Sequence, residues 1–300
     1  MKKVLRIIGL VLGSLLGILL LAGVILYLMG NARLNKTYDF PASNITVPED
    51  AAAIEYGKHR AEVLCQGCHG EDLSGIENWF NAGPLGTVDS ANITAGEGGI
   101  GKEYTTEDYV RAIRHGFGRD GKAIFMPAVF ATSYLSDEDL GAIIAYLKTV
   151  PPVDHQLQGE RFTPLAKIML AAGMLGKLPV EAVSHEVNVT APEMGATVEY
   201  GEYLVNTNDC HVCHGPELNG GPFPDPTITK ISPNLTPGGE LGFWSEEDFI
   251  SVMRTGVTPS DHQLDPEFMP WPSYSMFYDE ELNAIWLYLQ SLPKLTQYTE

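Results

Sequence analysis

The feature that most constrains the fold is an internal repeat that covers most of the chain. The motif Cys-x-x-Cys-His occurs at residues 65–69 and again at 210–214. Three further signatures recur around it in the same order: Glu-Tyr-Gly at 55–57 and 199–201, Asn-x-Thr at 92–94 and 234–236, and Met-Pro at 126–127 and 269–270. The offset between the copies stays between 140 and 145 residues. A period this long indicates two copies of one domain and not a solenoid of short repeats.

Each copy has the pattern of a small helical domain. Capping-box signatures, in which Thr or Ser precedes Asp by three residues, predict the starts of helices after Thr105 and Ser136 in the first copy and after Ser245 in the second. The expected helices cover residues 51–66, 105–116, 137–147, 195–209, 245–256 and 279–289. The Gly- and Pro-rich stretches 83–101 and 215–242 show no clear strand alternation. The predicted fold class is therefore all-α, with two tandem domains.

The N-terminus predicts a membrane anchor. Lys2, Lys3 and Arg6 precede an uncharged apolar run of 23 residues, Ile7–Met29. That length can cross a hydrocarbon core as a helix, whereas the apolar region of a cleaved signal is shorter and ends in small residues. The basic residues before the run place the rest of the chain outside the cytoplasm. We expect a single-pass protein of the cytoplasmic membrane with both domains on the periplasmic or extracellular side.

These signals give a linear organisation of five parts. Residues 153–190 have no counterpart in the repeat and contain a short apolar helix at about 164–177, which either packs between the domains or rests at the membrane surface. The expected parts are the anchor at 1–30, a stalk at 31–50, the first domain at 51–152, the linker at 153–190 and the second domain at 191–295.

Charge excludes one class of partner and suggests another. The chain has 19 basic and 38 acidic residues, a net charge of −19, which argues against nucleic-acid binding. Residues 191–300 hold only 3 basic residues against 17 acidic ones, a net of −14. This acidic body either keeps the protein soluble or steers a basic partner toward it.

The repeated cysteine motif has the spacing of a covalent haem site. On a helix, positions i, i+3 and i+4 share one face, so two thiols can bond the haem vinyl groups while the imidazole reaches the iron. A zinc site would need both pairs to meet, a disulfide leaves the histidines unexplained, and a thioredoxin motif expects a βαβ context. The predicted attachment residues are Cys65, Cys68 and His69 in the first copy and Cys210, Cys213 and His214 in the second.

Two further pairs of residues are candidates for contact with the haem. Met126 and Met269 align in the repeat, and each precedes Pro, so they are the expected sixth ligands, ahead of His262. Met253 and Met276 are expected to be packing residues. Arg114 and Arg254 also align, and each either binds a haem propionate or is a surface arginine favoured at a helix C-terminus.

With these motifs in place, the chain resembles class I cytochrome c domains. It is most similar to the cytochrome subunit of bacterial membrane-bound alcohol, aldehyde and gluconate dehydrogenases. The resemblance implies His69 and His214 as proximal ligands, Met126 and Met269 as distal ligands, and two covalently bound haem c groups. Many such subunits have three haem domains and a C-terminal membrane segment, whereas this chain has two domains and an N-terminal anchor.

The expected function is single-electron transfer. The partners are redox proteins: a dehydrogenase catalytic subunit as donor, and a basic acceptor or a terminal oxidase toward the respiratory chain. No convincing nucleophile or acid–base constellation occurs in either domain, so a non-catalytic role is expected. The alternative is a dihaem enzyme, such as a peroxidase or a thiosulfate-oxidising cytochrome, and the two matched Met ligands argue against an open iron.

Overall fold

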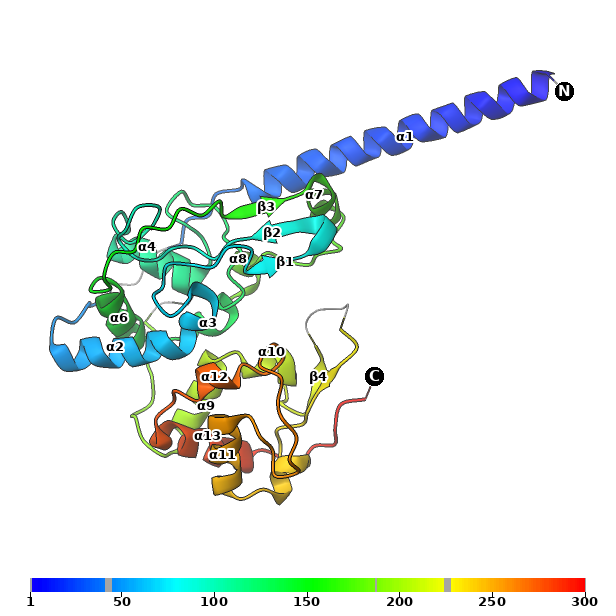
Figure 1. Ribbon diagram of the computed structural model, residues 1–300. Helices are drawn as coiled ribbons and strands as arrows, with labels where there is room; N and C mark the ends of the chain where they lie inside the picture. The colour runs from blue at the N-terminus through cyan, green and yellow to red at the C-terminus, as the bar shows by residue number, and fades with distance from the viewer. Residues whose placement is uncertain (1, 41–44, 187, 224–227, 300) are drawn as a thin grey trace.

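The computed structural model describes residues 2–40, 45–186, 188–223 and 228–299. Two helical bodies lie one above the other, and a long N-terminal helix projects from the first (Figure 1). The main helices are α1 (Lys2–Leu34), α2 (Ala51–Leu64), α3 (Gln66–His69), α4 (Thr106–Val110), α5 (Val129–Thr132), α6 (Asp137–Leu147), α7 (Pro164–Ala171), α8 (Pro179–Ala182), α9 (Val198–Thr207), α10 (Cys210–His214), α11 (Glu246–Thr255), α12 (Trp271–Tyr274) and α13 (Asp279–Ser291). The predicted helical class is confirmed.

The loops contain short strands that the sequence pattern did not indicate. Antiparallel β1 (Phe80–Asn81), β2 (Gly86–Val88) and β3 (Glu160–Phe162) form a sheet in the order β1-β2-β3. A second pair joins β4 (Gly221–Pro222) to β5 (Ile231–Ser232). At two or three residues, these strands are too short for alternation to be visible in the sequence.

The same helix crossing builds the core of both domains. Here α2 packs against α6, and α9 packs against α13. A Cβ atom on Gly57 would lie 1.9 Å from the Ala142 carbonyl oxygen, and one on Gly201 would lie 2.0 Å from the Ala284 oxygen. Only glycine permits this backbone contact, which explains why the Glu-Tyr-Gly signature recurs.

Local capping signals place most helix starts, while some helix ends differ from expectation. Thr105 and Ser245 both form complete capping boxes, with Asp108 and Asp248 respectively. The helix expected over 51–66 is divided, because α2 ends at Leu64 and the cysteine motif forms the separate helix α3. The helix starting after Thr105 continues beyond α4 as one π-helical turn, Arg111–His115, and the short helix expected at 164–177 ends at Ala171.

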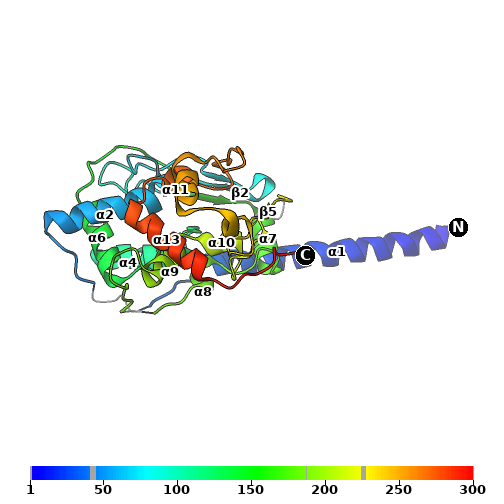
Figure 2. The same ribbon diagram turned by 90° about the horizontal axis from the view of Figure 1, so that it is seen from below.

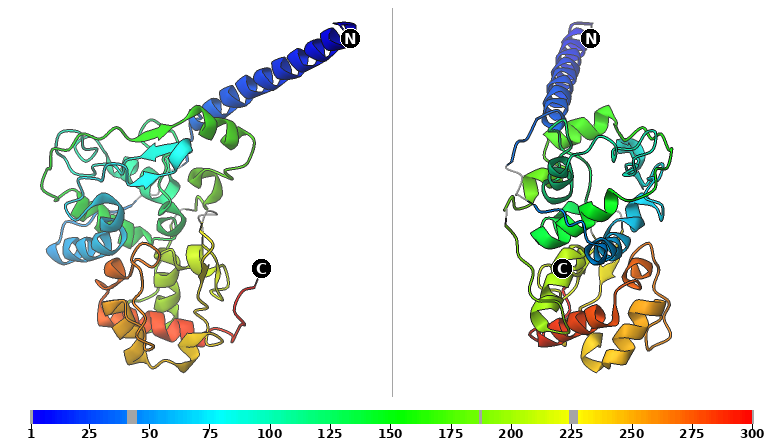
Figure 3. Two further views of the ribbon diagram at one scale, coloured as in Figure 1. Left: turned by 45° about the vertical axis from the view of Figure 1, so that its right-hand side comes forward. Right: turned by 90° about the vertical axis from the view of Figure 1, so that its left-hand side faces the viewer.

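Among the residues described, α1 is the helix long and apolar enough to cross a membrane. It leaves from the first domain, and the second domain lies on that domain's other side (Figure 3). Seen from below, the two domains overlap and α1 projects away from both (Figure 2). The segment expected as a linker packs closely on the first domain. In it, β3 pairs with β2, Arg161 forms an ion pair with Asp89 at 2.7 Å, and α7 packs against α1.

Candidate functional site

The short helices α3 and α10 hold the repeated thiol pairs, with Cys65 at the N-cap of α3. None of the four cysteines forms a disulfide, and each helix lies directly after the long first helix of its domain. Burial raises the pKa of Cys65 to about 12 and that of Cys210 to about 12. Because neither motif forms a disulfide, both sulfur atoms of each would be available for thioether bonds to a haem.

The histidine of each motif is oriented by a backbone carbonyl. His69 Nδ1 lies 2.7 Å from the Ala91 oxygen, and His214 Nδ1 lies 2.9 Å from the Pro233 oxygen. Burial lowers the pKa of both imidazoles, which favours their neutral form. With the Nδ1–H donating to the carbonyl, the Nε2 lone pair is left for a metal, as in most metal-ligating histidines.

The Asn-x-Thr loops hold these two carbonyls, a role that sequence reasoning did not assign. Asn92 immediately follows Ala91, and its Oδ1 accepts hydrogen bonds from the Thr94 backbone N–H at 2.9 Å and hydroxyl at 2.8 Å. Its Nδ2 donates to the Val153 oxygen at 2.8 Å. In the second domain Asn234 makes the same bonds, to Thr236 and to the Leu295 oxygen. The recurrence of the motif was the available signal.

The aligned methionines occupy matching places before short helices. Met126 precedes α5, and Met269 precedes α12; both side chains are half-buried. Met269 packs on the core cluster of the second domain, and Met253 is a buried member of that cluster. His262, the alternative ligand, is exposed. Iron ligation by Met126 and Met269 stays a prediction.

The aligned arginines make equivalent ion pairs at the start of the last helix of each domain. Arg114 lies 2.7 Å from the Asp137 carboxylate and donates to the Leu135 oxygen at 2.8 Å. Arg254 lies 2.6 Å from the Asp279 carboxylate. Arg114 is fully buried, so it is not the surface arginine that sequence reasoning offered as the alternative. Contact of either residue with a propionate stays a prediction.

The first cysteine motif lies against the second domain. A Cβ atom on Gly67, inside the first motif, would lie 3.3 Å from the Ser273 hydroxyl of the second domain. Burial raises the pKa of Cys68 to about 11, and the Asp209 carboxylate, next to the second motif, adds to that rise. The first attachment helix therefore faces the second domain and not only solvent.

These observations define a class of protein: tandem helical domains, each with two thiols three residues apart and an adjacent imidazole whose Nδ1 lies against a backbone carbonyl. That donor set fits covalently attached haem. The family model described as cytochrome c matches residues 54–151 and 198–293. The chain belongs to the cytochrome c family, and it is accordingly an electron-transfer cytochrome that carries covalently bound haem c.

Relatives of known function agree with this family. The chain is 30% identical to the cytochrome c subunit of a quinone alcohol dehydrogenase from Gluconobacter oxydans, over 83% of the chain and 56% of that relative. It is 30% identical to the fructose dehydrogenase cytochrome subunit of Gluconobacter japonicus, over 92% of the chain and 58% of the relative. A gluconate 2-dehydrogenase cytochrome c subunit from Pantoea cypripedii is 37% identical over 31% of the chain and 22% of the relative.

The chain thus spans little more than half the length of the first two relatives. All three are cytochrome subunits of dehydrogenases, which does not favour the peroxidase or thiosulfate-oxidising alternative.

Proposed function

We propose that the chain is a membrane-anchored dihaem cytochrome c that relays single electrons from a dehydrogenase catalytic subunit toward the respiratory chain. Each domain would bind one haem, through Cys65 and Cys68 in the first and Cys210 and Cys213 in the second. His69 and His214 would be the proximal ligands, and Met126 and Met269 the distal ones.

The observation that carries the proposal is the duplicated histidine geometry. The Ala91 and Pro233 carbonyls lie 2.7 and 2.9 Å from the Nδ1 atoms of His69 and His214. Two copies of the same orienting contact support two haem sites per chain. Bound haem c would supply one-electron exchange, and the protein would hold each group and tune its potential.

A relay needs the two sites to be near each other. The approach of Gly67 to Ser273 supports electron exchange across the domain contact, because it brings the first attachment helix against the second domain. A side chain at Gly67 would crowd this contact, since its Cβ atom would lie 3.3 Å from the Ser273 hydroxyl oxygen.

The donor and the side of the membrane are part of the proposal. The dehydrogenase relatives support a catalytic subunit as donor, and a basic redox protein or a terminal oxidase would be the acceptor. α1 would cross the cytoplasmic membrane once, with Lys2, Lys3 and Arg6 inside and both haem domains on the periplasmic side.

The test is a haem count on the full chain purified from its native membrane. We expect a pyridine haemochrome assay to give two haems per chain, both resistant to acid–acetone extraction. The variants Cys65→Ala/Cys68→Ala and Cys210→Ala/Cys213→Ala should each retain one. One haem or none in the unmodified chain would overturn the proposal, and subunits that co-purify would identify the donor.

A further inference from the structure

The first domain contacts α1 along the last residues of its apolar run. The run extends to Met29, yet Leu26 and Tyr27 are half-buried and Gly30 is buried, whereas almost all earlier residues of the helix are exposed. A Cβ atom on Gly30 would lie 1.9 Å from the Lys167 backbone oxygen of α7. The backbone of α7 therefore touches α1 at the end of the apolar run.

The contacts of α7 with α1 determine the position of α7 relative to the bilayer. Lys167 Nζ lies 5.5 Å from the centre of the Tyr27 ring and 2.8 Å from Asn31 Oδ1. A hydrocarbon core needs about 20 helical residues, so a run of 23 residues ends at the interface between acyl chains and headgroups. Tyr and Lys are residues of this interface, where the ring lies at headgroup level and the ammonium reaches water.

The turn after α7 is fixed to α1 and exposes apolar side chains. Arg33 donates to the Leu170 and Gly176 oxygens, each at 3.1 Å, and also pairs with Glu181. The turn between those oxygens carries Met174, which is 68% exposed, and Leu175, which is 40% exposed. Leu165 at the start of α7 is 45% exposed. These three residues form what we call the α7 apolar edge.

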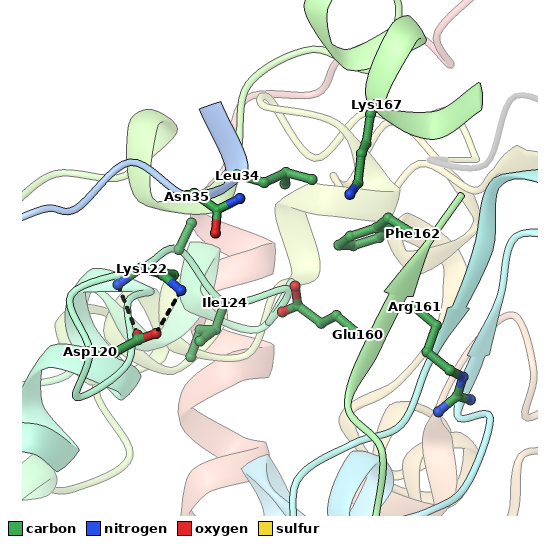
Figure 4. Close-up of a pocket in the computed structure, with 10 residues that line it drawn as sticks. Leu34, Asn35, Asp120, Lys122, Ile124, Glu160, Arg161, Phe162 and Lys167 are labelled. Atoms are coloured by element: carbon green, nitrogen blue, oxygen red, sulfur yellow. Dashed lines mark hydrogen bonds and ion pairs between the residues drawn. The ribbon is translucent and has the colours of Figure 1, made fainter. Parts of the chain in front are cut away.

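Several basic side chains lie near the end of α1 and the turn after α7. A pocket of about 470 Å³ opens between the end of α1, β3 and the 120–124 turn, and Lys122 and Lys167 line it beside Asp120 and Glu160 (Figure 4). Lys36 lies two residues beyond the end of α1, and Lys177 follows the turn. In a chain of net charge −19, this gathering of lysines fits the headgroup level of a bilayer, where lysine ammonium groups reach phosphate and water.

We propose that the α7 apolar edge inserts into the outer-leaflet interface of the bilayer, with the surrounding lysines at the headgroups. The contact adds a second attachment beside α1, and two attachments fix the orientation of the first domain relative to the membrane. Because the edge is continuous with the end of the apolar run of α1, we infer that lipid covers it. This inference rests on the proposed membrane span of α1.

The experiment uses the full haem-loaded chain in vesicles of phosphatidylethanolamine and phosphatidylglycerol, with a nitroxide spin label at one introduced cysteine. Labelling sites are Met174→Cys and Leu165→Cys on the edge, Ile18→Cys within α1, and Phe243→Cys, which is 91% exposed on the second domain. Power saturation compares relaxation by oxygen, which concentrates among acyl chains, with relaxation by a water-soluble nickel chelate.

We expect oxygen to relax the Ile18, Met174 and Leu165 labels more than nickel does, and the reverse at Phe243. Edge labels as open to nickel as the Phe243 label, with Ile18 still protected, would overturn the inference and leave the span intact. Edge labels shielded from both reagents would also overturn it, since that result indicates a protein contact. An Ile18 label open to nickel would instead overturn the span itself, and the inference with it.

Discussion

His59 of the first domain lies against Glu281 of the second, with 2.7 Å between His59 Nε2 and Glu281 Oε2. The equivalent residues of the two repeats make the reciprocal contact. Tyr203 of the second domain, equivalent to His59, donates its hydroxyl to Asp139 Oδ2 of the first domain, equivalent to Glu281, at 2.7 Å. Arg60, which is fully buried, lies 3.5 Å from the Asp139 carboxylate and 3.7 Å from that of Glu281. The two domains therefore pack through a reciprocal contact, like an isologous dimer within one chain.

This contact gives the first prediction. Glu281→Ala removes one buried carboxylate and leaves Arg60 and His59 without it, so we expect a loss of about 3 kcal/mol or more in the free energy of unfolding. Urea unfolding of the haem-loaded chain, followed by tryptophan fluorescence, measures it. His59→Tyr, which copies the residue of the other repeat, should cost far less than His59→Ala. Equal costs for these two His59 variants would contradict the reciprocal geometry.

The second prediction concerns a histidine pair on the first domain. His115 Nδ1 lies 3.1 Å from His185 Nδ1, and burial, with a smaller contribution from His185, lowers the pKa of His115 to about 4. In the unfolded chain the pKa is 6.5, so between pH 6.5 and pH 4 the unfolded state binds a proton that the folded state does not. The associated stability is complete above pH 6.5 and is lost as the pH falls toward 4.

A shift of this size corresponds to about 3 kcal/mol across that interval. Urea midpoints measured at pH 7, 6 and 5 should fall steadily in the unmodified chain. His115→Thr, which installs the residue found at the equivalent position 255, should show a much flatter pH dependence. The same slope in both proteins would assign the effect to other groups.

The third prediction concerns the distal ligands. Met126→Ala and Met269→Ala should each open one iron, lower its reduction potential and remove about half of the long-wavelength absorption of Met-ligated ferric haem. Potentiometric titration followed by absorbance measures both effects. Met253→Leu, a volume-conserving change at a buried core methionine, is the matched control and should leave the spectrum unchanged. An unchanged spectrum in Met269→Ala would transfer the role to His262 or Met276.

Local signals in the sequence were sufficient for the helix starts and for the attachment motifs. Thr105 and Asp108 are three residues apart, and their side chains make the capping box within one turn. The pairing of β2 with β3 joins residues 72 to 76 positions apart, as in Gly86 with Phe162, so a short-range pattern does not reveal it. The contact of His59 with Glu281 spans 222 residues, and the repeat alignment indicated only that each has an equivalent.

In the functional site, too, the sequence predicts features that are local in the chain and does not reveal those that depend on tertiary packing. The thiols and the imidazole of each motif are adjacent in the sequence, and their spacing alone predicts the chemistry. The carbonyls that orient the histidines lie 22 and 19 residues further along, and backbone atoms have no sequence identity of their own. The ion pairs of Arg114 and Arg254 with the last helix likewise depend on tertiary packing, so alignment identified the positions without their partners.

The last prediction concerns docking by the acidic second domain. Glu217 is exposed and lies three residues after His214, next to the second attachment motif. With a net charge of −14 on residues 191–300, electron exchange with a basic partner should slow about tenfold or more as the Debye length shortens from about 30 Å to about 8 Å. Stopped-flow rates across an ionic-strength series measure this.

Glu217→Lys should lower the rate at low salt, whereas Glu71→Lys, exposed beside the first motif, should have little effect if the partner docks on the second domain. A flat profile would indicate an apolar, salt-insensitive interface with a bound catalytic subunit, and it would remove electrostatic steering without changing the haem assignment.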